Sequence, residues 1–181
     1  DDKKLVKSLF EKISSSSSEV SGAIYMPEEP KDESYDQNKE MVFKFNDLKY
    51  KGSFLALRIE GDKISIDEKL KALTIELELS KLNTTVLDVH QSTPFWKKIN
   101  NLEIFKLTKN NLLRVVVPPS KGPKLMQFLG NKYKYYIDWC GSLYWIEVQS
   151  KKSSKVSDIK KLTKELGGYL TIIKTSDEYD Y

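Results

Sequence analysis

The chain has 181 residues, of which 39% are hydrophobic and 31% charged, with a net charge of +4 and a mean hydropathy of -0.50. This composition predicts one soluble globular domain with a packed core and excludes two large independent cores. No stretch approaches the ~20 apolar residues that span a bilayer, and the small net charge, spread along the chain, indicates no nucleic-acid partner.

The first half of the chain is predicted to open with an amphipathic helix and to continue into strands separated by an acidic insertion. A serine run ends the helical pattern, and Pro27 ends a short apolar run that suits a strand. Few core residues lie in 28–40, which we predict to be a mobile insertion. The expected elements are a helix over 2–13, a strand over 19–26, and two strands over 41–45 and 54–59.

The middle of the chain is predicted to hold two helices and one strand. Ser65 and Glu68 have the spacing of a capping box, and the apolar residues that follow recur along one helical face, which we expect to face the sheet. That face consists of Ile66, Leu70, Leu73 and Leu77. A strand is expected over 85–89, followed by a short helix over 92–99 with Pro94 in its first turn.

The second half alternates between strands and helices. Pro118 ends a β-branched run, and Gly167 with Gly168 closes the last helix. The expected elements are a strand over 112–117, a helix over 124–129, a strand pair or one bent strand over 133–148, a helix over 156–166 and a strand over 169–174. The mixture predicts one α+β domain over 1–181, with a largely antiparallel sheet, helices on one face and ferredoxin-like units, single or duplicated.

Sequence signals for catalysis and cofactor binding are sparse. The chain contains no glycine-rich phosphate loop, and one histidine with one cysteine is too few for a metal cluster. His90 follows a predicted strand, where a loop histidine is favoured over a general base. Cys140 lies in an apolar strand beside Asp138, where a small core residue is favoured over a reactive thiol, and a lone cysteine fits a reducing, cytoplasmic setting. We therefore predict no catalytic residue and no metal ligand in this chain, and no flavin bound by it alone.

Aromatic residues cluster between Tyr133 and Trp145 and are interleaved with Lys132 and Lys134. This pattern is compatible with a stacking platform for single-stranded nucleic acid. A sheet core with an aromatic rim is favoured, because aromatic residues are common in strands. No nucleic-acid partner is therefore expected.

Five short stretches carry a family pattern over nearly the whole chain. They are EVSGA at 19–23, LALRIEG at 55–61, LRVVVPPS at 113–120, YIDWCGSLYW at 136–145 and GGYLT at 167–171. In this order, and with the strands and helices expected between them, they resemble the C-terminal cap domain of the FAD-binding subunit of bacterial glycolate oxidase, a relative of the vanillyl-alcohol-oxidase-type flavoproteins. The segment 28–50 is the least family-like part.

The resemblance implies a FAD-linked oxidoreductase that acts on a 2-hydroxy acid such as glycolate. A flavin-binding domain would precede Asp1 and bind FAD, and this domain would cover the substrate side of the isoalloxazine ring without being catalytic alone. The implied partners are a homologous flavoprotein subunit and an iron-sulfur subunit, in a cytoplasmic complex that these partners can hold at the inner membrane. The chain ends before the family's Asn-Pro-Gly-Arg tail and lacks the His-His pair of the sister subunit. The complete subunit is therefore expected either to oxidise substrate or to serve as an electron-transfer or structural partner.

Two arginines stand out because the other 28 of the 30 basic residues are lysines. Both lie in predicted strands, where a planar guanidinium can hold a carboxylate through two hydrogen bonds. Either they grip a substrate carboxylate or face the flavin, or they form internal ion pairs with strand acids such as Glu60, Asp138 or Glu147. The internal pairs are favoured. The substrate-side or flavin-side candidates are Arg58, Glu60, Arg114, Asp138 and Trp139.

The alternative function is that of a non-enzymatic, ferredoxin-like module that docks a protein through a sheet face or edge. The reading frame upstream of Asp1 distinguishes the two functions. A flavin domain there would encode a glycine-rich segment that binds pyrophosphate.

Overall fold

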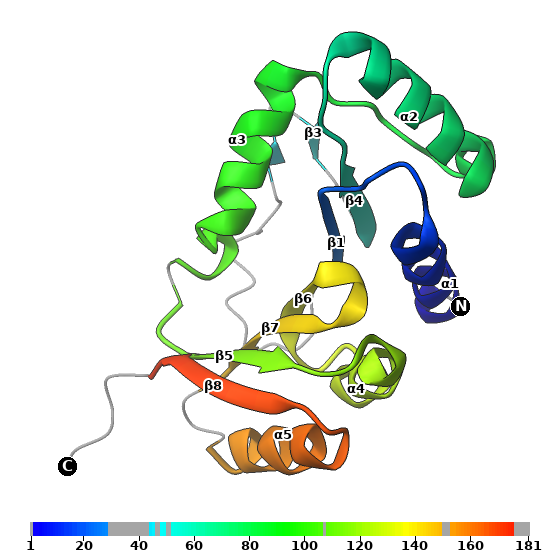
Figure 1. The fold of residues 1–181 in the computed structure, drawn as a ribbon. Coiled ribbons are helices and arrows are strands. Elements are labelled where there is room, and N and C mark those ends of the chain that lie inside the picture. Colours follow the sequence, from blue (N-terminus) through cyan, green and yellow to red (C-terminus); the bar gives the residue numbers. More distant parts are fainter. Residues whose placement is uncertain are drawn as a thin grey trace.

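The computed structural model is built on one six-stranded sheet in which every neighbouring pair of strands is antiparallel (Figure 1). The described residues are 2–28, 44–45, 48–49, 52–106, 108–149 and 153–175. The strand order is β4-β1-β6-β7-β5-β8. The bounds are β1 Gly22–Met26, β4 Phe54–Arg58, β5 Asn111–Val116, β6 Lys134–Asp138, β7 Leu143–Val148 and β8 Tyr169–Lys174. A separate two-stranded pair consists of β2, Lys44–Phe45, and β3, Leu48–Lys49.

Five α-helices and four short 3₁₀ turns connect these strands within the described residues. The helices are α1 Asp2–Ser15, α2 Lys63–Glu76, α3 Val89–Asn100, α4 Gly122–Leu129 and α5 Ser153–Glu165. The 3₁₀ turns are η1 Leu79–Lys81, η2 Glu103–Phe105, η3 Pro119–Lys121 and η4 Trp139–Gly141. The α+β class and the antiparallel sheet predicted from the sequence are thus confirmed.

The second half of the chain forms a ferredoxin-like unit. Its elements run β5-α4-β6-β7-α5-β8, and its four strands lie in the order β8-β5-β7-β6. The strands β1 and β4 extend this sheet beyond β6, and Tyr25 of β1 lies opposite Ile137 of β6 at the junction. The whole sheet is therefore wider than one such unit.

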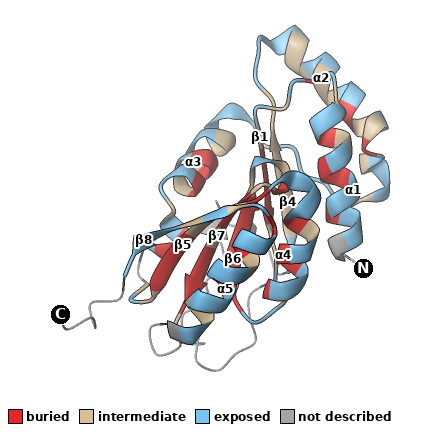
Figure 2. Ribbon diagram, turned by 60° about the horizontal axis from the view of Figure 1, so that its bottom comes forward, coloured by how far each residue is buried: buried red, intermediate tan, exposed pale blue. Residues whose placement is uncertain are grey.

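Two hydrophobic cores lie on opposite faces of the sheet, because side chains alternate along each strand. The larger core packs the sheet against α1, α2, α4 and α5, and its members include Phe10, Leu73, Leu125, Tyr144 and Ile159. The smaller core lies under α3 and contains Ile24, Phe95, Trp96, Ile99 and Tyr136. Figure 2 shows buried positions on the central strands and on the inner sides of the helices. The expectation of helices on one face holds for four helices, and α3 is the exception.

The segment before α3 corrects the sequence analysis. The strand expected over 85–89 is absent, since residues 83–88 have no regular structure and α3 begins at Val89. The reason is local capping: Asp88 accepts a hydrogen bond from the Gln91 amide at 2.9 Å, and the Gln91 side chain accepts one from the Asp88 amide at 3.2 Å. His90 is consequently an exposed residue in the first turn of a helix rather than a loop residue.

Helix α2 also begins earlier than expected. Asp62, not Ser65, is its N-cap residue, and its side chain accepts a hydrogen bond from the Ser65 amide at 3.0 Å. Leu73 and Leu77 are buried in the larger core as predicted, whereas Ile66 and Leu70 are half-buried. Residues 29–40 of the expected insertion, and 41–43 of the following strand, lie outside the described residues.

Replacing Leu73 by alanine is expected to lower the free energy of unfolding by about 2–5 kcal/mol, because this side chain is 2% exposed and its removal leaves a cavity. The matched control is Ile75→Ala, two residues along the same helix and 79% exposed, which should change stability by less than about 0.5 kcal/mol. Urea denaturation of both variants measures the difference. Equal midpoints for the two variants would show that the core side of α2 is misassigned.

Candidate functional site

The turn between β6 and β7 has an uncommon backbone. Trp139, Cys140 and Gly141 all have positive φ angles, of 50°, 50° and 93°. Asp138 stabilises the turn by accepting a hydrogen bond from the Trp139 amide at 2.7 Å, and the Ser142 hydroxyl donates to the Trp139 carbonyl at 2.8 Å. Non-glycine residues in this region are uncommon and gather at functional sites. The turn leaves the Trp139 side chain 56% exposed.

A surface hollow of about 370 Å³ opens beside this turn. Its walls come from four parts of the chain that are distant in sequence: the start of β1, the end of β4, one side of α3 and the β6–β7 turn. The polar or aromatic residues among them are Ser21, Arg58, Trp96, Asn100, Asp138 and Trp139. Gly22 lies at its base, where a Cβ atom would approach the Trp96 ring to 3.2 Å, so the small residue lets α3 pack closely on the sheet.

Arg58 at the end of β4 is held by Glu60. One guanidinium nitrogen, Nη2, lies 2.8 Å from Glu60 Oε1, and the two side chains are 38% and 54% exposed. An ion pair with this exposure contributes little to stability. Its effect is to fix the position of the guanidinium at the mouth of the hollow.

Arg114 lies on the face of the sheet that α3 leaves uncovered. It is opposite Trp145 of β7 and Thr171 of β8. Its guanidinium carbon is 5.5 Å from the centre of the Trp139 ring, which is a cation–π contact. Among the described residues no carboxylate forms an ion pair with Arg114, so its donors are not committed to an acid of this domain.

Asp138 is the titratable group of the hollow. Partial burial raises the pKa of its carboxyl group above the ordinary value, and the hydrogen bond from the Trp139 amide offsets part of this rise. Desolvation therefore dominates, because the turn and α3 shield this carboxylate from water. A carboxylate with a raised pKa binds a proton more readily than an exposed one.

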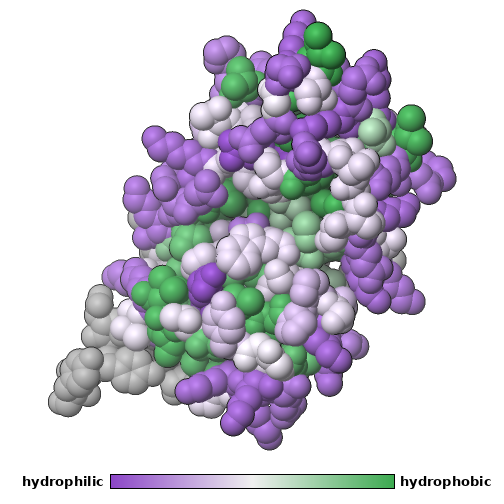
Figure 3. Space-filling model, in the orientation of Figure 1, coloured by the Kyte–Doolittle hydropathy of each residue, from purple (hydrophilic) through white to green (hydrophobic). Residues whose placement is uncertain are grey.

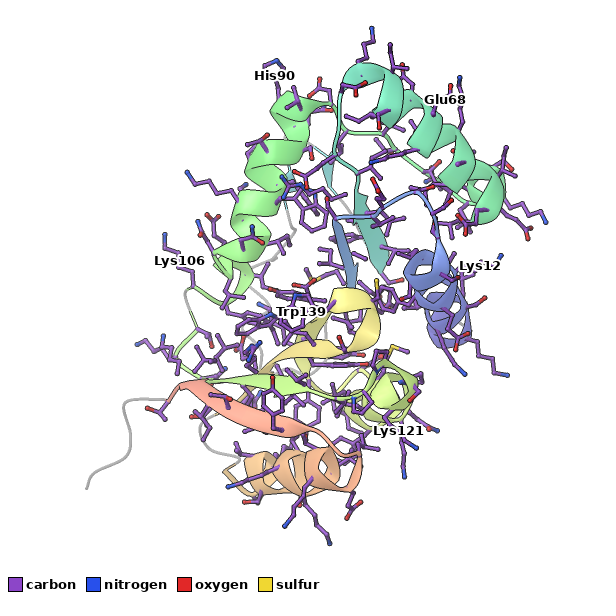
Figure 4. All side chains as sticks on the ribbon, viewed as in Figure 1. Lys12, Glu68, His90, Lys106, Lys121 and Trp139 are labelled. Carbon is purple, nitrogen blue, oxygen red and sulfur yellow. The ribbon has the colours of Figure 1, made fainter. Side chains whose placement is uncertain are left out.

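The five candidates named from the sequence converge on this region. Arg58, Asp138 and Trp139 line the hollow, Arg114 joins them through the Trp139 ring, and Glu60 joins them through Arg58. Figure 4 shows Trp139 next to the β6–β7 turn and His90 at the far end of α3. Figure 3, in the same orientation, shows apolar and weakly polar side chains across the middle of this view and charged ones above and below.

Sequence reasoning missed two residues of the hollow, Trp96 and Asn100. Both are on α3 and lie four residues apart, so they share one side of the helix. That spacing was the available signal. It carried no information about which face of the sheet the helix would cover.

Glu147 does not pair with an arginine. It is buried, and its Oε1 atom accepts hydrogen bonds from the Thr108 hydroxyl at 2.8 Å and from the Asn110 side-chain amide at 2.6 Å. The favoured hypothesis of internal arginine pairs therefore applies to Arg58 with Glu60 and not to Glu147.

Cys140 corrects the sequence analysis in its location, since it lies in the turn and not in a strand. It is half-buried, and burial together with nearby Asp138 raises the pKa of its thiol, while a hydrogen bond with Ser14 acts in the opposite direction. A thiol with a raised pKa is a poor nucleophile at neutral pH. The thiol also borders a second, mostly apolar hollow of about 320 Å³ between α1 and α4.

The aromatic cluster is a sheet core, as favoured from the sequence. Its tyrosines are buried, with Tyr135 and Tyr144 stacked in the larger core and Tyr136 stacked on Phe105 in the smaller one. Trp139 is the large aromatic residue of the cluster that is mostly exposed. The single exposed indole does not make a stacking platform for several bases.

Within the described ranges, no group of three or more His, Cys, Asp or Glu side chains is arranged to hold a metal ion. The helices in the same part of the chain are all too short or too polar to cross a membrane. No protein-family model and no curated protein matches the chain.

Asp138→Asn is expected to raise the free energy of unfolding relative to the parent increasingly as the pH rises. Because the folded-state pKa of Asp138 is raised, the folded parent binds its proton more tightly than the unfolded chain and loses stability as the pH rises from the unfolded value, about 3.9, through the folded value. Asparagine keeps the acceptor for the Trp139 amide but does not titrate.

Urea denaturation between pH 3 and pH 7 measures this difference, with Asp67→Asn on the exposed side of α2 as a correction for the loss of one negative charge. A difference between Asp138→Asn and the parent that stays constant across this range, or that shrinks with rising pH, would contradict the assigned burial of the carboxylate.

Proposed function

We propose that this domain is the substrate-side cap of a FAD-linked 2-hydroxy-acid oxidoreductase subunit of the glycolate-oxidase type, and that it is not catalytic alone. The flavin-binding domain of the same subunit precedes it in the chain. A homologous flavoprotein subunit and an iron-sulfur subunit are the partners of the complex, which is cytoplasmic.

The observation that carries the proposal is a convergence in space. The five stretches that resemble the family are dispersed between residues 19 and 171 of the sequence. Four of them contribute residues to the region around Trp139: Ser21 and Gly22, Arg58 and Glu60, Arg114, and Asp138 with Trp139 and Cys140. The fifth contributes β8, which flanks Arg114. A chance resemblance in scattered segments would have no reason to gather at one face of the sheet.

The side chains of this face fit a planar cofactor and an anionic substrate. An exposed indole and a guanidinium both pack against flat aromatic rings, so Trp139 and Arg114 suit the isoalloxazine side. Arg114, Arg58 and Asn100 are hydrogen-bond donors suited to the carboxylate of a 2-hydroxy acid. When bound, FAD would accept the hydride from the carbon that bears the hydroxyl group. The role of this domain is to orient the acid and to exclude water from the reacting atoms.

The structure assigns different surroundings to the two arginines, and this difference ranks them. Arg58 already contacts Glu60, whereas Arg114 contacts only an aromatic ring among the described residues. An arginine whose donors are free is the better ligand for an external carboxylate. Arg114 is therefore the main anchor of the substrate in this proposal, and Arg58 frames the hollow.

In the complete complex, Arg114→Lys is expected to lower 2-hydroxy-acid oxidation by about 10- to 100-fold, the loss of one charge-assisted hydrogen-bonded contact of about 1.5–3 kcal/mol. The melting temperature should stay close to that of the parent. The matched control is Arg58→Lys, which keeps an exposed ion pair with Glu60 and should change both quantities little. Full activity of Arg114→Lys, or a fall in melting temperature that accounts for its loss of activity, would contradict the anchoring role.

The isolated domain over 1–181 is expected to bind neither FAD nor FMN, because the sequence holds no glycine-rich loop for the phosphates. Absorbance of the purified domain in the visible range, after incubation with each flavin and gel filtration, measures this. A stoichiometric yellow chromophore would contradict the division of labour between the two domains.

A second candidate function is that of a protein-interaction module, which the edge strand β8 favours. Three of its apolar side chains are about half exposed, namely Tyr169, Ile172 and Ile173 at 55%, 49% and 47%. Exposed strand edges of this kind pair with strands of other proteins. An upstream reading frame without a flavin-binding domain would favour this function over the redox one.

A further inference from the structure

The first half of the chain repeats the arrangement of the second half around the junction of β1 with β6. In the second half the order is α4, β6, β7, α5, and in the first half it is α1, β1, β4, α2. The sheet order β4-β1-β6-β7 places the two hairpins back to back, with the equivalent strands β1 and β6 antiparallel at the centre. The equivalent helices all contribute to the same hydrophobic core. The two halves are therefore related by a local two-fold axis.

The repeat is incomplete at one place. In the second half, β5 precedes α4 and lies beside β7. The corresponding place in the first half precedes α1 and lies beside β4, and among the described residues no strand occupies that edge. After α2 the chain turns through η1 to α3, which packs on the opposite face, so the counterpart of β8 is replaced by another element.

Burial along the two equivalent strands reflects this difference. In β7, which has neighbours on both sides, five of six residues are buried, and Trp145 alone is half-buried. In β4, with one neighbour, all five residues are half-buried, although four of them are the apolar Phe54, Leu55, Ala56 and Leu57. An apolar strand with half-exposed side chains on both faces gains burial when a further strand pairs with it.

We propose that the segment immediately N-terminal to Asp1 forms a β-strand that pairs antiparallel with the free edge of β4 and completes a seven-stranded sheet. The occupant is a strand of about five residues with apolar side chains facing both cores. This inference rests on the internal repeat and not on the proposed enzymatic function.

The direction of the chain supports this occupant. A strand antiparallel to β4 is parallel to β1, so it ends at the edge of the sheet where β1 ends and β4 begins. Helix α1 runs back from that edge to the start of β1 through the short loop 16–21. The marked N-terminus in Figure 1 lies at the outer end of α1, away from this loop. Strand, α1 and β1 then form a β-α-β unit, for which a connection of this kind needs no crossing of the chain.

The test is hydrogen–deuterium exchange on the full-length protein, in which the segment before Asp1 is present. The backbone amides of Phe54–Arg58 that point away from β1 are expected to exchange slowly, by at least about 100-fold relative to an unpaired edge. Two proline substitutions at alternate positions in the ten residues before Asp1 remove strand pairing there and should return these amides to fast exchange. The amides of β8, at the opposite edge of the sheet, should not change.

Fast exchange of the β4 amides in the unsubstituted protein would overturn the proposal, because the edge would be unpaired. Slow exchange that survives the two prolines would overturn it as well, because another segment of the chain or a partner would then cover the edge. Exchange of the peptides in α4 and β7 checks that the proline variant remains folded. A variant that loses protection throughout is replaced by one with a single proline at each position in turn, and loss of β4 protection in neither single variant overturns the proposal.

Discussion

The close approach of α4 to the β6–β7 turn is the contact on which the candidate site depends. A Cβ atom at Gly122 would overlap the carbonyl oxygen of Gly141 and would lie 2.8 Å from the Tyr144 hydroxyl oxygen. That hydroxyl donates a hydrogen bond to the Gly122 carbonyl at 2.8 Å, and both groups are buried. The start of α4 is thereby fixed against the turn. Any larger residue at position 122 would push the turn outward.

This contact explains why the strained turn persists. Two successive non-glycine residues with positive φ cost about 1–3 kcal/mol each, so the surroundings must hold them. Gly122 and Tyr144 hold the turn from the α4 side, and the Phe10 ring lies 3.3 Å from the Cβ position of Gly141 on the α1 side. The outcome is that Trp139 projects onto the opposite face of the sheet, where Arg114 contacts it. The core on one face thus positions the candidate site on the other.

Elements that depend on local sequence patterns could be predicted, and elements that depend on long-range packing could not. Strand β8 has the bounds expected from its apolar run, and α4 was expected because its apolar positions recur at helical spacing. The start of α3 was missed because the apolar Val86 suggested a strand, whereas the side chains of Asp88 and Gln91 cap a helix. Capping residues outweighed a weak alternation of apolar and polar residues.

The composition of the candidate site shows the same limit. Arg58 and Arg114 were found because arginine is rare in this chain, and Trp139 because it belongs to a family-like stretch. Trp96 and Asn100 could not be found in this way, since their role follows from α3 crossing to the face opposite the other four helices. The crossing also separates the roles of the two arginines, because it encloses Arg58 beside α3 and leaves Arg114 on the uncovered strands.

The incomplete repeat accounts for where the uncovered surface lies. In the first half, α3 takes the chain away from the position that β8 fills in the second half, and its side chains cover β1, β4 and part of β6. No helix among the described residues does the same for β7, β5 and β8, so the boundary of α3 runs along the junction between the two halves. Trp139 lies at that boundary because it follows β6, the strand at the junction. A site at the boundary of two repeats can draw side chains from both, which is how Arg58 of one half and Arg114 of the other come to share one tryptophan turn.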